Sequence, residues 1–547
     1  MAASLAKLGI DRLVLSIHQA SFPASDDDVG HGAPASTRGL AFVAWARAHG
    51  FTGVALGPSG ITTRENPSPY DATGLSRNPL HLALGIAAPP ERTDRVCYAH
   101  AWDTVRAELR RRAATEASAG DVRARLAERR RTAPWIEAEA RFEAIAAALG
   151  HDDWRAWPSD TAALEVAGAD AALAFEYGQL LADEQQAAFA RHVTSLGMSL
   201  YGDLPIGISH RDRWALAGAF LPGYAMGAPP SRTNPAGQPW DFPVLDPAGA
   251  HGAAAFLARR LDRLLDGHTG VRIDHPHGWV CPWVYRTDDP DPLHAVQHGA
   301  RLHESPDLDD HPALAAYARV RSDQLDHTRP RHDDHWVRAL EPAQIDRYAA
   351  LFDALVARVR ARGFAPGELM VEVLSTCPAP LAAVLARHGL GRYRVTQKAR
   401  VEEPSDVYRS DNAAPADWIM AGNHDTPPVR AVIARWRAAG GDELERRARF
   451  LSARLRMPAA EIARDDRSLA TAMLAELFLG PARNVLVFWV DLFGGTESYN
   501  RPGVVAASNW CLRVPADFER AHAEAVTRGD APDLREAVGW ALRARAG

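Results

Sequence analysis

Eight short apolar segments, each ending in polar or turn-forming residues, constrain the fold of this 547-residue chain more than any other feature. Helix-like stretches separate most of them. Continuous apolar strands that alternate with amphipathic helices are typical of a parallel sheet covered on both faces. Eight such strands predict an α/β fold, a (β/α)8 TIM barrel with inserted helical subdomains. The segments are LVLSI (13–17), GVALGP (53–58), MSLYGDLP (198–205), GVRID (270–274), ELMVE (368–372), YRVTQ (393–397), WIMAGNHD (418–425) and NVLVFWVD (484–491).

We interpret residues 1–547 as a single (β/α)8 catalytic domain that carries two insertions. Residues 95–197 are rich in Ala, Arg and Glu and free of strand signals, so they predict an inserted, mainly helical subdomain. Residues 286–340 are high in His, Asp and Pro and predict loops and short helices above the barrel, near the active site.

Charge and cysteine content exclude several classes of function. The net charge is −6 and acidic and basic residues are interspersed, so nothing indicates a nucleic-acid partner. The four cysteines form no CxxC pair, which argues against a zinc knuckle and a disulfide framework. We expect no membrane span, because no run of about 18 apolar residues occurs, and the N-terminus lacks a signal-like apolar stretch. A cytoplasmic location is the expectation.

Three carboxylates follow predicted strands, at the ends where active sites of such barrels lie. They are Asp274 in VRIDH, Glu372 in LMVEV and Asp425 in GNHDT. Cleaving a glycosidic bond with retention needs a carboxylate nucleophile and a carboxylic acid about 5–5.5 Å apart. Arg272 points to the same side of its strand as Asp274 and would keep it ionised. The apolar surroundings of Glu372 would raise its pKa, which suits a proton donor.

Each of these residues also has a plainer interpretation. A single Asp or Glu at a strand end is more often a helix cap or a loop residue, and His275 and His424 alone would more often be structural. Only the three carboxylates taken together, with the RxDH and NHD motifs around them, favour a catalytic role over a structural one. The histidines between 294 and 335 are predicted to lie in loops, without the i, i+4 pairing on a helix or the paired cysteines of a defined site, so we predict neither a metal site nor a cofactor.

The set resembles the 4-α-glucanotransferase family (amylomaltase, or disproportionating enzyme), a relative of the α-amylase superfamily. The family's RIDH pattern carries its nucleophile, which implies this role for Asp274. Its glutamate after an apolar strand implies Glu372 as the acid/base, and its HD pair implies Asp425 as the residue that stabilises the transition state. The neighbours Arg272, His275 and His424 are implied as substrate contacts.

Further motifs extend the resemblance over most of the chain and imply more sugar contacts. They are Ser68 and Tyr70 in NPSPYDATGLSRNPL (66–80), Asp203 in YGDLPIGISHRDRWA (201–215), Gln238 and Trp240 in the lid-like GAPPSRTNPAGQPWDFP (227–243), and Asn500, a weaker candidate, in YNRPGVVAASNWCLRVP (499–515). Judged alone, the two aromatic residues are as consistent with a core position as with a platform for a sugar ring.

The resemblance implies an enzyme that transfers α-1,4-glucan segments between maltooligosaccharides by retaining double displacement, through a covalent glycosyl-enzyme. The donor would be an α-1,4-glucan or maltooligosaccharide, and the acceptor glucose or a maltooligosaccharide. Two alternatives stay open: an α-glucan hydrolase or transglycosylase with an unusual donor or acceptor, and a catalytically silent glucan-binding protein.

The chain departs from the family's pattern around the predicted site. Ser231 and Arg232 follow the double proline of the lid-like segment, where the family usually has an acidic residue. Other departures are Pro276 and His277 after RIDH, Val373 after the glutamate, Pro427 and Pro428 after NHDT, and a longer gap between Asp274 and Glu372. These changes surround the carboxylates without removing them, so they imply an altered substrate or acceptor preference.

Overall fold

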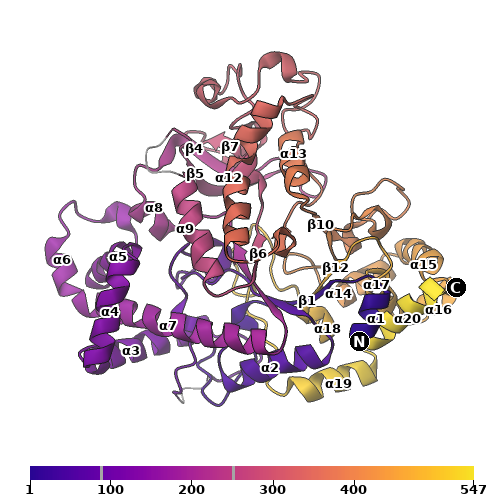
Figure 1. Cartoon of the computed structure of the whole chain (residues 1–547), viewed down its shortest axis with the longest axis horizontal. Helices are drawn as coiled ribbons and strands as arrows, with labels where there is room; N and C mark the ends of the chain where they lie inside the picture. The colour runs from indigo at the N-terminus through magenta and orange to yellow at the C-terminus, as the bar shows by residue number, and fades with distance from the viewer. Residues whose placement is uncertain (87–89, 249–252, 441, 547) are drawn as a thin grey trace.

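All eight predicted strands are present and form a parallel barrel. The structure is a computed structural model that describes residues 1–86, 90–248, 253–440 and 442–546 (Figure 1). The barrel strands are β1 (Arg12–Ser16), β2 (Gly53–Ala55), β3 (Ser199–Leu204), β6 (Gly270–Ile273), β9 (Leu369–Val371), β10 (Tyr393–Val395), β11 (Trp418–Met420) and β12 (Asn484–Phe488). Asp274, Glu372 and Asp425 lie in the turns after β6, β9 and β11, whereas Asp203 lies within β3.

The strands follow one another around the barrel in chain order. The hydrogen-bonded sheet runs β10-β11-β12-β1-β2-β3-β6-β9. Its two ends meet just beyond β9, where the backbone N–H of Tyr393 donates to the carbonyl oxygen of Val373 at 3.2 Å. The (β/α)8 prediction is thereby confirmed.

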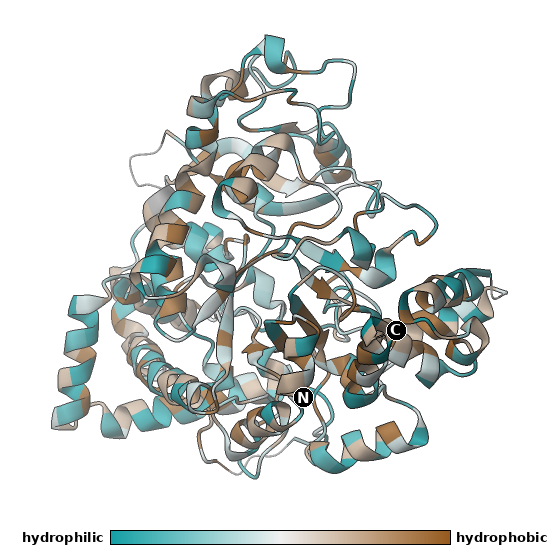
Figure 2. Ribbon diagram, turned by 45° about the vertical axis from the view of Figure 1, so that its right-hand side comes forward, coloured by the Kyte–Doolittle hydropathy of each residue, from teal (hydrophilic) through white to brown (hydrophobic). Residues whose placement is uncertain are grey.

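Both faces of the strands are buried, which explains why their sequences are continuously apolar. Val14 packs with residues of other strands inside the barrel, whereas its neighbours Leu13 and Leu15 pack outward against the helices. In β6, Val271 and Ile273 likewise pack outward, so Arg272 between them points into the barrel. Figure 2 shows hydrophobic residues gathered on the central strands and alternating with hydrophilic ones along the helices.

Helices surround the barrel, and none of those described is long and apolar enough to cross a membrane. Those outside the region between β2 and β3 are α1 (Ala2–Lys7), α2 (Thr37–Ala48), α8 (His210–Ala215), α9 (Ala253–Leu265), α10 (His277–Val280), α11 (Pro292–Gln297), α12 (Pro342–Ala361), α13 (Ala379–His388), α14 (Val429–Ala438), α15 (Asp442–Leu455), α16 (Ala459–Ile462), α17 (Asp466–Glu476), α18 (Trp489–Leu492), α19 (Phe518–Arg528) and α20 (Leu534–Ala546).

The chain between β2 and β3 is largely helical, and its helices project from one side of the barrel (Figure 1). The last of them packs against the barrel core through Phe189 and Val193. We propose that these helices, the last included, form the subdomain predicted for residues 95–197. They are α3 (Tyr98–Glu116), α4 (Gly120–Thr132), α5 (Trp135–Leu149), α6 (Ala162–Ala167) and α7 (Ala169–Ser195).

A second, antiparallel sheet was not expected from the sequence. It runs β5-β4-β7-β8, and its four strands are β4 (Phe220–Ala228), β5 (Gln238–Leu245), β7 (Trp283–Arg286) and β8 (Ala300–Arg301). The lid-like segment 227–243 therefore forms the turn of a β4–β5 hairpin and most of β5. Register shifts between these two strands blur the alternation that would have identified them.

The His- and Asp-rich segment contains short helices and turns, and one strand of the second sheet lies within it. Its first two histidines are not in an irregular loop. His294 lies on α11 and His298 caps that helix, with ring centroids 4.1 Å apart. In the described part of the chain, no three or more His, Cys, Asp or Glu side chains form a group that could hold a metal ion.

Candidate active site

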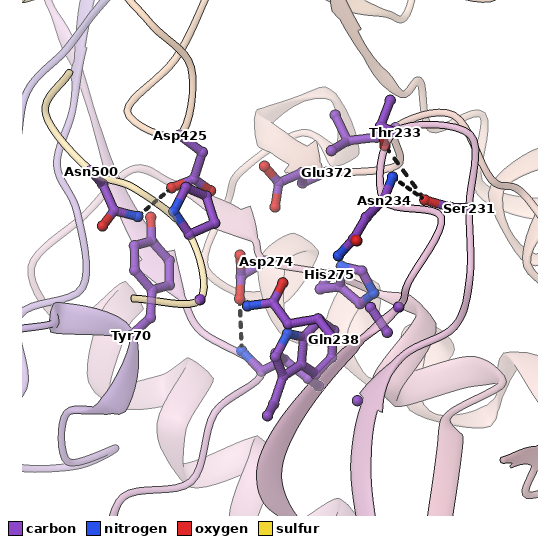
Figure 3. Close-up of a pocket in the computed structure, with 18 of the residues that line it drawn as sticks. Tyr70, Ser231, Thr233, Asn234, Gln238, Asp274, His275, Glu372, Asp425 and Asn500 are labelled. Carbon is purple, nitrogen blue, oxygen red and sulfur yellow. Dashed lines mark hydrogen bonds between the residues drawn. The ribbon is translucent and has the colours of Figure 1, made fainter. Parts of the chain in front are cut away.

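A cavity of about 1230 Å³ lies at the carboxyl ends of the barrel strands (Figure 3). Nine of the twelve predicted site residues line it: Ser68, Tyr70, Gln238, Trp240, Asp274, His275, Glu372, Asp425 and Asn500. The other three, Asp203, Arg272 and His424, lie beneath its floor. With Tyr70 they line a cavity of about 20 Å³, close to the size of one water molecule.

Asp274 directly follows β6 and is held by hydrogen bonds from two elements. Its backbone N–H donates to the carbonyl of Leu204 at 3.1 Å, which continues the β3–β6 pairing. Its Oδ2 accepts from the backbone N–H of Ile206 at 3.2 Å, and its Oδ1 from Nη2 of Arg272 at 3.1 Å. The remaining face of the carboxylate is open to the cavity (Figure 3).

Glu372 follows β9, the strand next to β6, and its backbone N–H donates to the carbonyl of Ile273 at 3.1 Å. Its Oε2 lies 2.6 Å from Nη2 of Arg272. Burial raises the pKa of Glu372, and the negative charge of Asp274 adds to this, although the Arg272 guanidinium opposes it.

The nearest oxygens of Asp274 and Glu372 share one nitrogen, Nη2 of Arg272, at 3.1 Å and 2.6 Å. The sum of these distances is the upper limit of their separation. That limit is shorter than the separation of about 6.5–9.5 Å that inverting glycosidases need to accommodate a water molecule. The pair is therefore close enough for a retaining reaction.

Arg272 is the centre of a buried network below the carboxylates. Its Nη1 donates to Oδ2 of Asp203 at 2.6 Å and to the hydroxyl of Tyr70 at 3.1 Å, and this hydroxyl donates to the same Asp203 oxygen at 2.9 Å. Burial raises the pKa of Asp203 to about 7, against the opposing effect of Arg272. Arg272 thus contacts three carboxylates, and their orientation depends on it.

Asp425 lies in the turn after β11 and is oriented by the C-terminal part of the chain. Its Oδ1 accepts a hydrogen bond of 2.6 Å from Nδ2 of Asn500 (Figure 3). The backbone N–H of Asn500 donates to the carbonyl of His424 at 3.1 Å. The His424 ring stacks on Tyr70 with centroids 5.2 Å apart. The weakest candidate of the sequence analysis therefore contacts the third carboxylate directly.

The β4–β5 hairpin forms one wall of the cavity. Trp240 meets the ring of His275 edge-on, with centroids 4.6 Å apart. The backbone of His275 has a φ of 41°, an uncommon conformation for a residue with a side chain. Removal from water lowers the pKa of His275 to about 4, so the ring is neutral near pH 7.

The two departures in the lid-like segment have distinct partners. The Ser231 hydroxyl accepts from the backbone N–H of Asn234 at 3.1 Å and closes the hairpin turn. Arg232 forms an ion pair with Asp406, whose side chain is fully buried, and its guanidinium lies 5.2 Å from the centroid of the Tyr408 ring. The hairpin is thereby attached to the loop that follows β10.

Several residues around the cavity were missed by the sequence analysis. His18 is buried next to the site, with ring centroids 5.0 Å from His424 and 5.2 Å from Trp510. Lys398 lines the cavity itself. His18 follows a predicted strand and offered no signal besides that position, whereas Lys398 is unusual in composition, since only it and Lys7 are lysines among 62 basic residues.

Comparisons with known proteins agree with this geometry. The family described as 4-alpha-glucanotransferase matches residues 17–518. A 4-alpha-glucanotransferase of Mycobacterium bovis is 29% identical over 261 residues, which are 42% of this chain and 36% of that protein. The chloroplastic/amyloplastic 4-alpha-glucanotransferase of Oryza sativa is 28% identical over 282 residues, or 45% of this chain and 47% of that protein. The alignments thus span less than half of either relative.

A solved structure shares the fold over nearly the whole chain. The amylomaltase from Streptococcus agalactiae in complex with acarbose superposes with a TM-score of 0.72, covering 95% of this chain and 99% of that one, at 16% identity.

Proposed function

Because the chain belongs to the 4-alpha-glucanotransferase family, we propose that it transfers segments of α-1,4-glucans between maltooligosaccharides by a retaining double displacement. The observation that carries this proposal is the pair of carboxylates, Asp274 and Glu372, that share Nη2 of Arg272. A pair this close leaves no room for the water of an inverting reaction and suits a covalent glycosyl-enzyme.

In the first step, Asp274 attacks the anomeric carbon of the donor sugar while Glu372 protonates the departing 4-oxygen. The bond from C1 to this oxygen breaks as the bond from C1 to Asp274 forms. The raised pKa of Glu372 supports its role as the acid. In the second step, Glu372 takes the proton of an acceptor's 4-hydroxyl, whose oxygen displaces Asp274 from C1.

Asp425 is proposed to bind hydroxyl groups of the reacting sugar more strongly in the oxocarbenium-like transition state than in the ground state. The hydrogen bond from Asn500 orients its carboxylate, and the other oxygen, 3.5 Å from Nε2 of His424, would face the sugar. Tyr70 and Arg272 support this arrangement from below through their contacts with His424 and Asp274.

Transfer requires that the acceptor sugar outcompete water for the glycosyl-enzyme. Trp240 and the hairpin that carries it cover one wall of the cavity and would exclude water from the reacting carbon. We propose glucose and maltooligosaccharides as acceptors and α-1,4-glucans as donors. The cytoplasmic location stays a prediction.

Incubation with maltotriose tests the proposal, because disproportionation produces both glucose and longer maltooligosaccharides. Wild-type protein is expected to give both, and Asp274→Asn neither. Glucose and maltose without longer products would select a hydrolase. Binding of maltooligosaccharides without any product would select a silent glucan-binding protein.

A further inference from the structure

Lys398 occupies the strand end between the two strands that lead to Glu372 and Asp425. Glu372 follows β9 and Asp425 follows β11, and β10 lies between these strands. β10 pairs with β11, and the backbone N–H of Tyr393 in β10 donates a hydrogen bond to the carbonyl of Val373, just after β9. Lys398 is the last residue of the short 3-10 helix that follows β10, and it lines the catalytic cavity.

The turn that carries Lys398 is fixed from behind by a buried arginine. Arg447 of α15 donates hydrogen bonds to the carbonyl oxygens of Thr396 at 3.1 Å and Gln397 at 3.3 Å, and also to that of Ala399. The side-chain amide of Gln397 donates to the carbonyl of Pro427 at 3.2 Å, next to the Asp425 turn. Lys398 therefore projects from a rigid support.

The ammonium of Lys398 has no protein partner of its own. It is half-buried, and within the described ranges no residue accepts a hydrogen bond from it or forms an ion pair with it. Burial lowers the pKa of Lys398, while the charges of Asp425 and Glu372 raise it. When a glucan fills the cavity and displaces water, a desolvated ammonium with three donors needs oxygen acceptors from the ligand.

The position of Arg232 indicates which sugar supplies these oxygens. Besides the two carboxylates, the positive charge of Arg232 on the β4–β5 hairpin affects the pKa of Lys398, and it lowers it. Figure 3 shows Glu372 between Asp425 and the hairpin residues Ser231, Thr233 and Asn234. Lys398 lines the same cavity as these residues and interacts electrostatically with Glu372, Asp425 and the hairpin residue Arg232. This position is consistent with contact to the sugar on the far side of the oxygen that Glu372 protonates.

We propose that Lys398 is a specificity-determining residue that donates hydrogen bonds to hydroxyl groups of the acceptor sugar. The proposal rests on the proposed function and adds a contact that the sequence analysis did not include. Lysine suits the task because its ammonium is a compact charge with rotatable donors on a flexible stem, whereas arginine presents a planar fork. All but one of the other basic residues in this chain are arginines.

The test measures transfer from maltotriose to ¹³C-labelled glucose at varied glucose concentration, with products counted by mass spectrometry. Lys398→Met has a similar length but no donor. We expect this variant to raise the KM for labelled glucose about tenfold, which corresponds to the loss of one charge-assisted hydrogen bond. The fraction of glycosyl-enzyme that reacts with water should increase. At saturating labelled glucose the rate of maltotriose consumption should change less than threefold, since a filled acceptor site restores the second step.

Two matched variants separate this role from a structural one. Lys398→Arg keeps the charge, so its KM for labelled glucose should lie between those of wild type and Lys398→Met. Lys7, the only other lysine, lies on α1, and Lys7→Met should have the wild-type KM. A KM for labelled glucose within twofold of wild type in Lys398→Met would overturn the role of Lys398. Wild-type protein that produces no labelled maltooligosaccharide would instead overturn the proposed function itself.

Discussion

Arg272 lies closer to Glu372 than to Asp274, although the sequence analysis assigned it to Asp274. Its Nη2 is 2.6 Å from Oε2 of Glu372 and 3.1 Å from Oδ1 of Asp274. One guanidinium therefore serves both carboxylates, and it cannot by itself make one an acid and the other a nucleophile. The difference comes from burial, which raises the pKa of Glu372, while Asp274 accepts an additional backbone hydrogen bond from Ile206.

Replacing Asp274 by alanine should remove the nucleophile and lower transfer from maltotriose on the order of 10⁴-fold or more. With α-maltosyl fluoride as donor, added azide can enter the space left by the carboxylate and should give the β-azide. Nuclear magnetic resonance identifies the anomer. Asp71→Asn serves as control, because Asp71 lines the same cavity but bonds to Asn66 at 2.9 Å. A transfer rate for Asp274→Ala near that of this control would exclude Asp274 as the nucleophile.

Replacing Glu372 by alanine should affect donors according to their leaving group. Maltotriose needs a proton donor, so its cleavage should fall about 10²–10⁴-fold, whereas fluoride leaves without one, and release of fluoride should persist as a burst. Azide would then attack the glycosyl-enzyme and give the α-azide, the opposite anomer to that from Asp274→Ala. The same anomer from both variants would contradict the assignment.

The pH dependence of wild-type activity should follow the protonation of Glu372. Its pKa is raised, so the acid form persists above the usual range of a glutamic acid. We expect kcat/KM for maltotriose to fall as pH rises through this pKa, because the proton donor is lost. Fluoride release from α-maltosyl fluoride should lack this alkaline limb. An identical limb with both donors would assign it to another group.

Breaking the ion pair between Arg232 and Asp406 should destabilise the protein. The Asp406 side chain is fully buried, and that of Arg232 is 27% exposed. Arg232→Met leaves a buried carboxylate without its cation, which costs about 3 kcal/mol of unfolding free energy. Adding Asp406→Asn removes the charge and should restore more than half of that loss. Urea unfolding of both single variants and the double variant measures the coupling, and additive losses would show that the two residues do not interact.

Buried histidines should make the protein unstable in acid. Burial lowers the pKa of His268 to about 3, so between this value and about 6.5 the unfolded chain binds a proton that the folded chain does not. Stability is therefore lost as pH falls below 6.5, and His268 alone accounts for about 2 kcal/mol by pH 5. The unfolding free energy of His268→Gln should fall less steeply over this range. The exposed His151→Gln should keep the wild-type slope, and equal slopes for all three proteins would reject the assignment.

The barrel, and the strand ends at which its carboxylates lie, could be predicted from the sequence. Strands buried on both faces must be continuously apolar, so all eight were visible as runs that end in polar residues. The carboxyl ends of parallel strands meet at one rim, which is why Asp274, Glu372 and Asp425 could be assigned to one site before any contact was known.

The contacts that build the rim could be seen only in the folded chain. The antiparallel sheet above the barrel depends on pairing between β4, β5, β7 and β8, which local sequence does not encode when strands are short and shifted in register. The sharing of Arg272 by three carboxylates, and the position of Lys398 between Glu372 and Asp425, arise because strands far apart in the chain are neighbours in the barrel. Burial, charge interactions and hydrogen bonds depend on which residues are neighbours in space, and these neighbours are set only when the barrel closes.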